Sequence, residues 1–400
     1  MSARLMVLAL AAAILCSSRV FAASATPTHA ASPASAQALA AISPPRAAVP
    51  AAPTRAQIDS IGRLVANFMR ANQVPGMSVA LVLNGQPVWS HGYGYADLEN
   101  RVPATDSTVY RSASIGKTMT ATAAMELVEA GKLDLNADIR QYCSAFPAKK
   151  WKITPLDLLR HTSGIRHYGG PHDQDEQYST IHYASVEDAL APFKDDTLQF
   201  QPGTKWLYST YGYCVLGCVV EGAAGVPYLD YVKSHVWQPA GMSETRDDDP
   251  AAIVPHRAQG YVLENGKLRR ARVSDITNRL PAGGFITTVE DLARFAAANL
   301  ANRLVSAETF ARMITPTRLP SGDTLSYGMG WGVETEPWHD DSYVYHGGST
   351  AGVSGVLVIM PRHRYAVAIL SNLEDIPGER RGELSEDITR LMLGFEPRRP

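Results

Sequence analysis

Apolar residues near the start of the folded region follow first a helical and then a strand-like spacing. Over about 56–72 they lie three or four positions apart, which predicts an amphipathic helix. The apolar, β-branched run 77–83 predicts a strand, and Asn84-Gly85 directly after it is a strong hairpin-turn signal. Residues 87–95 predict the second strand of that hairpin. The domain is therefore expected to begin with a helix followed by a β-hairpin.

Helical patterns dominate the middle of the chain. Residues 118–130 are rich in Ala, Met and Leu and stop at Gly131, which predicts a buried helix with a C-terminal glycine. Thr154-Pro155 combines a capping residue with a first-turn proline and predicts the start of another helix. From about 140 to 300 the pattern consists mostly of helices and long loops.

Strand-like runs return near the C-terminus at 343–346, 353–360 and 365–370, and 379–393 is expected to close the chain as a helix. Strands at both ends with helices between them predict one antiparallel sheet that both termini build. The expected fold class is α/β (α+β), with helices flanking this sheet and a mostly helical lobe, about 140–300, inserted into it. A cleft between the sheet and the lobe is the natural place for a site.

The start of the chain has the composition of a secretory signal peptide. A positively charged beginning precedes an apolar run of 11 residues, Leu5 to Leu15, which is shorter than the roughly 20 residues that span a bilayer. Val20-Phe21-Ala22 then provides small residues where a signal peptidase reads the chain. Residues 23–55 are rich in Ala, Pro and Ser and predict a linker. We therefore expect a signal peptide at 1–22, a folded domain at 56–400, a secreted or periplasmic location, and no integral membrane span.

Overall composition mainly excludes some classes of protein. The chain has 400 residues, and its 45% hydrophobic residues are enough for a substantial core, which excludes wholesale disorder. Lys and Arg total 37 against 39 Asp and Glu, giving a net charge of -2. No nucleic-acid partner is expected, because such binding is driven by the neutralisation of phosphates.

The cysteines are too few for a disulfide scaffold. Cys143, Cys214 and Cys218 remain after removal of the signal peptide. Cys214 and Cys218 lie in an apolar, helical stretch, where small buried thiols are the favoured interpretation. A bridge from Cys143 to one of them is the alternative in an oxidising compartment. The spacing is not that of a zinc site, and neither a metal nor a cofactor is expected.

Ser114-Ile115-Gly116-Lys117 is a candidate catalytic tetrapeptide. Residues three apart share one face of a helix, so Lys117 is expected beside the Ser114 hydroxyl. A helix N-terminus also favours developing negative charge. Together these features describe a serine that is activated without a histidine. An ordinary lysine at an exposed helix start is the alternative.

Two further short motifs follow along the chain. Tyr208-Ser209-Thr210 comes after a turn at 201–205, and His346-Gly347-Gly348-Ser349 lies at the edge of a strand-like run. The glycines would let a substrate backbone approach closely. Taken singly, the first motif is also typical of a core tyrosine and the second of a simple turn.

The order SxxK, Y-x-S/T and H-x-G resembles the active-site set of the penicillin-recognising serine hydrolases. The residues of these motifs are most similar to those of the class C β-lactamase group, which includes serine D-peptidases, family VIII esterases and the mitochondrial serine β-lactamase-like proteins. Three further tracts, 158–168, 207–213 and 282–285, carry the same resemblance. The resemblance covers about 56 to 375 and implies a β-lactamase/transpeptidase-like fold.

This resemblance implies a role for each motif residue. Ser114 would be the nucleophile that forms an acyl-enzyme, and Lys117 would help to remove its proton. Tyr208 would be the acid or base that handles the leaving group. His346 holds the place of the lysine in K-T-G, and Gly348 keeps the backbone open.

The oxyanion hole would consist of the backbone N–H groups of Ser114 and Ser349. Free Tyr and Lys titrate near 10 and 10.4, so neither is a base at neutral pH without a change of environment. Lys117 and Tyr208 would titrate as a coupled pair, and which of them is the resting base stays open.

Two positions depart from the commonest β-lactamase pattern. Thr210 replaces the Asn of Y-x-N, which removes an amide that can both donate to and accept from a substrate amide. His346 replaces a lysine and need not carry a charge near pH 7. Both changes weaken the case for penicillin turnover and favour peptide or ester hydrolysis.

Histidines and carboxylates crowd one stretch of the chain, at His161, His167, His172, Asp173, Asp175, Glu176 and His182. A metal site is one interpretation, but the helical H-x-x-x-H spacing is absent. A polar, solvated rim of the cleft is favoured.

Two classes of function follow from the sequence. The first is a secreted, cofactor-free serine hydrolase that cleaves an amide or ester bond in a small molecule or peptide, cell-wall peptides among them. Within this class a true β-lactamase is the alternative to a peptidase or esterase. The second class is a non-catalytic binding or scaffold protein on the same fold.

Overall fold

The computed structural model describes residues 51–169, 176–336, 341–396 and 398. The expected signal peptide and residues 23–50 of the expected linker lie outside the described residues, as do His172, Asp173 and Asp175.

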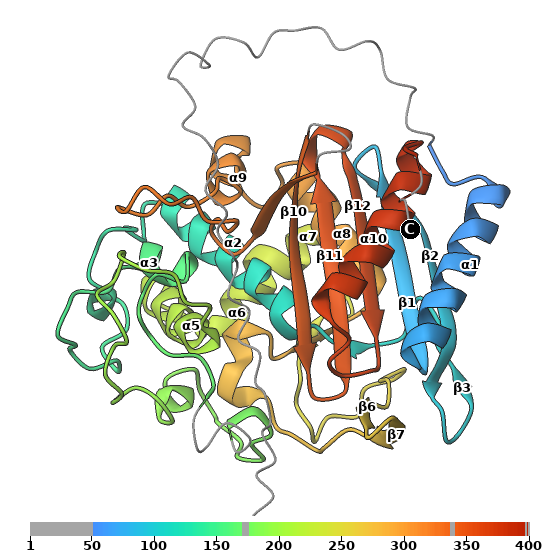
Figure 1. The fold of residues 1–400 in the computed structure, drawn as a ribbon. Helices are drawn as coiled ribbons and strands as arrows, with labels where there is room; N and C mark the ends of the chain where they lie inside the picture. The colour runs from blue at the N-terminus through green and yellow to red at the C-terminus, as the bar shows by residue number, and fades with distance from the viewer. Residues whose placement is uncertain (1–50, 170–175, 337–340, 397, 399–400) are drawn as a thin grey trace, which may run out of the picture. The chain divides into compact units, whose positions relative to one another are not determined.

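The central element is a seven-stranded antiparallel sheet (Figure 1). Its strands, in spatial order, are β3 (Val102–Pro103), β2 (Gln86–Asp97), β1 (Gly76–Leu83), β12 (Tyr365–Ser371), β11 (Val353–Met360), β10 (Asp341–Thr350) and β9 (Gly332–Glu336). β1 and β12 pair in a register that places Val79 opposite Ile369, so the two ends of the domain meet in the middle of the sheet. The prediction of one antiparallel sheet built from both ends is confirmed.

Helices, loops and two small sheets make up most of the described chain outside the central sheet. The described α-helices are α1 (Arg55–Asn72), α2 (Gly116–Glu129), α3 (Pro155–Leu159), α5 (Thr210–Ala224), α6 (Tyr228–Val232), α7 (Gln238–Ala240), α8 (Val289–Leu300), α9 (Ala307–Met313) and α10 (Gly378–Leu393). The 3-10 turns are η1 (Ala113–Ile115), η2 (Ile139–Gln141), η3 (Asp188–Leu190), η5 (Thr277–Ala282) and η6 (Pro361–His363), and η4 (Lys233–Trp237) is a π-helical turn. The small sheets contain β4 (Tyr110–Arg111), β8 (Phe285–Thr287) and β5 (Arg246–Asp247), and β6 (Tyr261–Glu264) with β7 (Lys267–Arg270).

Helix boundaries follow from local capping. The Thr54 hydroxyl accepts from the backbone N–H of Gln57, whose side chain accepts from the backbone N–H of Thr54, and α1 begins there. Thr154 and Asp157 form the same capping box before α3. This second helix is short, since His161 soon follows with a left-handed φ of 59°.

The inner strands β1, β11 and β12 of the central sheet are buried on both faces. Val79 and Leu81 of β1 pack with buried residues of α1 and α10, which lie in front of the sheet in Figure 1. Ala80 and Val82 point to the other face and belong to a larger core with residues of α2, α5 and α8. This alternation is the period-two geometry of a strand, and it explains why β1 is apolar at nearly every position.

The small sheet of β4, β8 and β5 brings two distant segments together beside η1. The backbone N–H of Ser112 donates to Phe285 O at 2.8 Å, and Tyr110 pairs with Thr287. The tract 282–285 is thereby held against the turn that carries Ser114.

Cys143 and Cys218 form a disulfide, and Cys214 is a buried free thiol. The favoured interpretation of Cys218 as a buried thiol is therefore wrong, and the alternative bridge to Cys143 is present. α5 packs closely against the segment that carries Cys143, since a Cβ on Gly222 would lie 1.7 Å from Tyr142 O. Such close backbone contact is not visible in the spacing of cysteines along a sequence.

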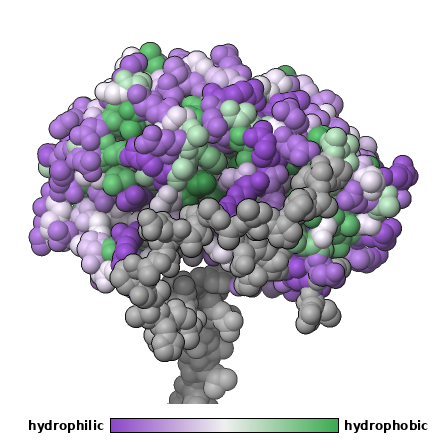
Figure 2. Space-filling view, turned by 90° about the horizontal axis from the view of Figure 1, so that it is seen from above, coloured by the Kyte–Doolittle hydropathy of each residue, from purple (hydrophilic) through white to green (hydrophobic). Residues whose placement is uncertain are grey.

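The face in Figure 2 is mostly hydrophilic, with hydrophobic residues in separate patches. Within the described part of the chain no single helix has the length and hydropathy to cross a membrane. α5 together with Tyr228–Ala240 reaches that threshold only as a pair bent by 79°.

Candidate active site

Ser114 lies in η1, directly before α2, and Lys117 lies in the first turn of α2. Lys117 Nζ donates to Ser114 Oγ at 3.0 Å, to Ala282 O at 2.8 Å and to Thr210 Oγ1 at 3.3 Å. Lys117 is completely buried, whereas Ser114 is partly exposed. The serine hydroxyl therefore lies between a buried amine and an accessible surface.

Two glycines make room for the turn that carries Ser114. A Cβ on Gly348 would lie 2.7 Å from Ser114 N, and a Cβ on Gly283 would lie 2.0 Å from Ala113 O. Ala113 itself has a φ of 46°, which is uncommon for a residue other than glycine and is typical of strained turns at functional sites. We expected Gly348 to leave room for a substrate backbone, but the backbone that it accommodates is that of the nucleophile.

Tyr208 and Thr210 flank the start of α5. Ser209 caps this helix, because its hydroxyl accepts a first-turn backbone N–H at 2.9 Å. Lys117 Nζ lies 5.0 Å from the centre of the Tyr208 ring, and Tyr208 and Ser114 line the same cavity. The structure thus brings together Ser114 of η1, Lys117 of α2 and Tyr208, which directly precedes the cap of α5.

Burial changes the pKa values of Lys117 and Tyr208 in opposite directions. Burial, with a smaller contribution from Arg279, lowers the pKa of Lys117 to about 7. Burial raises the pKa of Tyr208 well above its ordinary value, although the nearby Ser114 side chain opposes this. At neutral pH the phenol stays protonated while a large fraction of the lysine is a free amine. The environment therefore favours Lys117 as the base, a choice that the sequence left open.

His346 lies in β10 and is only 5% exposed. Its Nδ1 donates to Gly347 O at 2.6 Å, which leaves Nε2 to accept from the Tyr327 hydroxyl at 3.1 Å. Burial, and then the nearby Lys117, lower the pKa of His346 to about 3. His346 is therefore a neutral imidazole and does not supply the permanent charge of the lysine in K-T-G.

A cavity of about 180 Å³ opens beside Ser114. Tyr208, Thr210 and Ser349 line it from the expected motifs. The other lining residues are Ala113, His167, Tyr168, Gln177, Arg279, Ala282, Gly283 and Thr350. His346 is not one of the lining residues, and its ring centre lies 6.3 Å from that of Tyr208.

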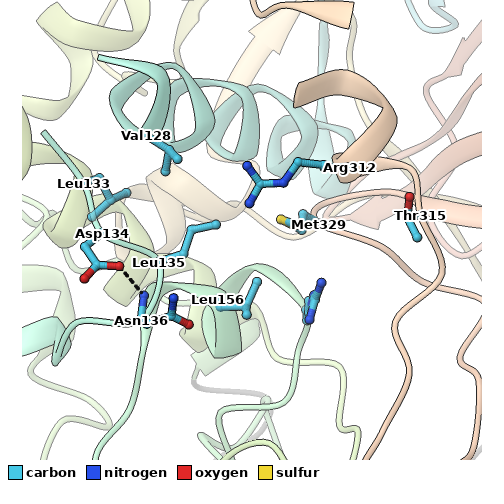
Figure 3. A pocket seen from close by; sticks show the side chains of 10 residues that line it. Val128, Leu133, Asp134, Leu135, Asn136, Leu156, Arg312, Thr315 and Met329 are labelled. Carbon is cyan, nitrogen blue, oxygen red and sulfur yellow. Dashed lines mark hydrogen bonds between the residues drawn. The ribbon is translucent and has the colours of Figure 1, made fainter. Parts of the chain in front are cut away.

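Two larger cavities, of about 360 and 550 Å³, hold none of the residues of the three catalytic motifs. Figure 3 shows the first, where Arg312 extends over apolar side chains that include Leu135 and Met329. The chemistry-bearing residues therefore gather at the smaller cavity.

His161 and His167 hold the backbone around Tyr208. His161 Nδ1 accepts from the N–H of Ser209, and His167 Nδ1 accepts from the N–H of Thr210, both at 3.1 Å. The His161 ring is buried, with its centre 4.4 Å from that of Tyr208. The expectation of a solvated rim is therefore wrong for His161.

His182 does lie at the surface, where its Nδ1 is 2.9 Å from Asp275 Oδ2 and its side chain is 60% exposed. Within residues 51–169, 176–336 and 341–396, no group of three or more His, Cys, Asp or Glu side chains is placed to hold a metal ion.

Three residues near the site carried no signal that we recognised in the sequence. Tyr327 hydrogen-bonds His346, and Arg381 of α10 donates to the carbonyls of Gly348 and Gly355, which fixes β10. Arg279 lines the cavity from η5. For Arg279 the neighbouring tract 282–285 could have served as the signal, whereas Tyr327 and Arg381 reach the site from segments that no motif marks.

The arrangement is that of a serine hydrolase in which a buried lysine and a tyrosine lie next to the nucleophile. The family model described as Beta-lactamase matches residues 61–387, and the chain belongs to this family. The resemblance stated from the motifs is thereby confirmed.

Individual relatives agree with this assignment. The chain is 30% identical to the mouse mitochondrial serine beta-lactamase-like protein LACTB, in an alignment that covers 74% of this chain and 71% of that protein. It is 28% identical to penicillin-binding protein 4* of Bacillus subtilis, over 73% of this chain and 66% of the relative. Among solved structures it is similar to the octameric penicillin-binding protein homologue from Pyrococcus abyssi, with a TM-score of 0.73 and 26% identity, over 85% of this chain and 78% of that one.

Proposed function

We propose that this protein is a serine hydrolase that cleaves an amide or ester bond through an acyl-Ser114 intermediate. The observation that carries the proposal is the 3.0 Å hydrogen bond between Nζ of a fully buried Lys117 and the hydroxyl of a partly exposed Ser114. Burial that lowers the lysine pKa to about 7 produces the free amine that such a reaction needs at neutral pH.

In the first half-reaction Lys117 accepts the proton of the Ser114 hydroxyl while Oγ bonds to the carbonyl carbon of the substrate. The N–H groups of Ser114 and Ser349 stabilise the negative charge on the carbonyl oxygen. Tyr208, which is protonated, gives its proton to the leaving nitrogen or oxygen as that bond breaks. The proton on Lys117 then restores the tyrosine.

In the second half-reaction water attacks the acyl carbon. Lys117 and Tyr208 accept one proton of the water, and Ser114 Oγ leaves as it regains a proton from the same pair. The acid product is released and the starting protonation states return.

Peptidase or esterase activity is the more strongly supported choice within this class. His346 is neutral, so the cation that would bind a β-lactam carboxylate beside H-x-G is missing there. Thr210 accepts from Lys117 instead of presenting an amide to the substrate. A true β-lactamase is the alternative, and hydrolysis of nitrocefin at a rate comparable with that of ester or D-Ala-D-Ala substrates would favour it.

The test is covalent labelling. A fluorophosphonate or penicillin probe should add one adduct to Ser114, seen by intact-mass measurement, and Ser114→Ala should remove it. Turnover of p-nitrophenyl esters that depends on Lys117 would exclude a purely binding or scaffold role. An adduct that persists in Ser114→Ala, or no adduct at all, contradicts the proposal.

We also propose that the chain is exported, to a secreted or periplasmic location. The composition of residues 1–22 and the disulfide between Cys143 and Cys218 support this proposal, since disulfides persist in oxidising compartments. Expression of the full chain should yield a mature protein that begins after Ala22, as N-terminal sequencing would show. An intact N-terminus in the cytoplasmic fraction would contradict it.

A further inference from the structure

A cavity of about 360 Å³ lies at the opposite end of α2 from the nucleophile. Val128 lines it from the last turn of α2, and Ser114 directly precedes the first turn of that helix. At 1.5 Å of rise per residue the two positions are about 20 Å apart along the helix. Among the described residues, no lining residue is shared with the cavity that contains Ser114. The larger cavity is therefore separate from the proposed catalytic machinery.

Apolar side chains form much of the lining of this cavity. They belong to Val128, Leu133, Leu135, Leu156 and Met329, and Figure 3 shows Leu135 and Met329 extending into the space from two sides. The volume lies in the usual range of small-molecule sites, about 300–1,000 Å³. It equals the volume of about 12 water molecules in the liquid, which is room for an aliphatic molecule of about ten non-hydrogen atoms.

Arg160 and Arg312 add two guanidinium groups to this apolar lining. Arg160 is the C-cap of α3, and its Nε is buried without a hydrogen-bond partner among the described residues. Arg312 of α9 extends over the cavity in Figure 3, where no hydrogen bond joins it to another residue drawn. Buried donors without an acceptor are rare in native structures, so an acceptor for Arg160 is expected.

The nearby carboxylates leave these charges largely uncompensated. Asp157 of α3 is engaged in the capping box of that helix, and Asp134 lines the cavity but accepts from the backbone N–H of Asn136 at 2.9 Å. Burial lowers the pKa of the Arg160 guanidinium, Asp157 opposes this change, and the neighbouring Arg312 adds to it. The two guanidinium groups therefore repel each other across a space that holds no anion from the described chain.

We propose that this cavity binds an aliphatic monoanion, such as a medium-chain carboxylate. Arg160, Arg312 and Asp134 give the lining a net charge of about +1, which a single negative charge neutralises. Guanidinium groups match a carboxylate in planar, bidentate geometry, and the apolar side chains cover the aliphatic part. This site goes beyond the proposed hydrolase function and does not depend on it.

Three compounds test the two parts of this ligand by calorimetric titration of the full chain. Octanoate has both parts, octanol lacks the charge, and acetate lacks the aliphatic body. Octanoate should bind about tenfold or more tightly than either of the others, because each of them loses one class of contact. Equal binding of octanol or acetate overturns the proposal, as does an octanoate Kd weaker than about 10 mM.

Arginine variants show whether the charges bind the anion. Arg160→Gln and Arg312→Gln should each weaken octanoate binding by about tenfold, the effect of one charge-assisted hydrogen bond. Arg312 is exposed on α9, so Arg312→Gln tests the proposal even where Arg160→Gln fails to fold. The matched control is Arg303→Gln, which alters an exposed arginine outside the cavity and should leave binding unchanged. Equal affinity in the wild type and Arg312→Gln overturns the proposal.

Methyl resonances of ¹³C-labelled methionine locate the bound molecule. Octanoate should shift the Met329 resonance, assigned through Met329→Leu, and should leave that of Met392 in α10 unchanged. Ser114→Ala should bind octanoate as tightly as the wild type, because Ser114 does not line this cavity. A Met329 resonance that does not respond, or loss of binding in Ser114→Ala, overturns the proposal. Neither result bears on the acyl-Ser114 reaction, which covalent labelling tests separately.

Discussion

At the scale of single residues, the site depends on what burial does to two side chains. The sequence identified Ser114, Lys117 and Tyr208 through spacing and order, but it could not assign their protonation states. Those states depend on how far segments that are distant in the chain shield the two side chains from water. One such segment contains Ala282, whose carbonyl accepts a hydrogen bond from Lys117. For the same reason the sequence left Arg279 unnoticed, since a surface arginine and a buried one look alike in a sequence.

The lowered pKa of Lys117 predicts the pH dependence of the reaction. Activity requires the free amine, so kcat/KM for a neutral p-nitrophenyl ester should rise with pH through about 7 and then level off. Lys117→Ala should lower kcat/KM by about 10²- to 10⁴-fold and abolish this rise. A profile that falls between pH 6 and 8 would contradict the assignment of Lys117 as the base.

Burial of Lys117 also predicts a loss of stability at low pH. Its folded-state pKa of about 7 lies below the ordinary value of 10.5, so between these values the unfolded chain binds more protons. The free energy of unfolding therefore falls as the pH drops from about 10 to 7, and the loss is complete below 7. The full shift corresponds to an upper limit of about 5 kcal/mol.

Lys117→Met should therefore be inactive but more stable than the wild type, by about 1–3 kcal/mol at pH 6. Denaturant unfolding at pH 6 and pH 10 measures the difference, which should shrink at the higher pH. A variant that is less stable than the wild type at pH 6 would show that the hydrogen bonds of the amine outweigh its desolvation.

At the scale of elements, β10 decides the shape of the site. The sequence predicts a strand only over 343–346, whereas β10 runs from Asp341 to Thr350 and includes Gly347 and Gly348. Glycines are poor strand formers, and pairing with β9 and β11 overrides that preference. Elements such as α1 and β11 could be predicted, because helical spacing marks the apolar face of α1 and a continuous apolar run marks a strand that is buried on both faces.

The close contact between β10 and η1 predicts a sharp difference between neighbouring glycines. In Gly348→Ala the new Cβ would lie 2.7 Å from Ser114 N, so the nucleophile turn must shift and labelling of Ser114 should fall by at least about tenfold. In Gly347→Ala the nearest atoms would lie at 3.8 Å, and labelling should stay close to that of the wild type. Rates of fluorophosphonate labelling compare the two, and equal rates would contradict this account.

At the scale of the whole molecule, the disulfide connects the loop after η2 to α5, the helix that begins beside Tyr208. Cys143 and Cys218 are separated by 75 positions, so the bridge restricts a long stretch of the unfolded chain. The sequence identifies the three candidate cysteines but does not determine which two of them form the disulfide. That choice depends on how α5 packs against residues 142 and 143.

Reduction should therefore destabilise the wild type by about 2–4 kcal/mol. Thermal unfolding with and without dithiothreitol measures this effect. The double variant Cys143→Ser/Cys218→Ser should resemble the reduced wild type and should show no further response to the reductant. A wild-type melting temperature that does not change on reduction would contradict a stabilising bridge.

The pairing of β1 with β12 has a consequence for biosynthesis. β1 leaves the ribosome early, but one of its two neighbours in the sheet, β12, follows much later in the chain, so the sheet cannot close until that later segment has been made. β10, which packs against Ser114, also comes from this late segment. A nascent or prematurely terminated chain therefore carries its serine without the strand that shapes it, and reactivity begins only when the C-terminal strands have joined the sheet.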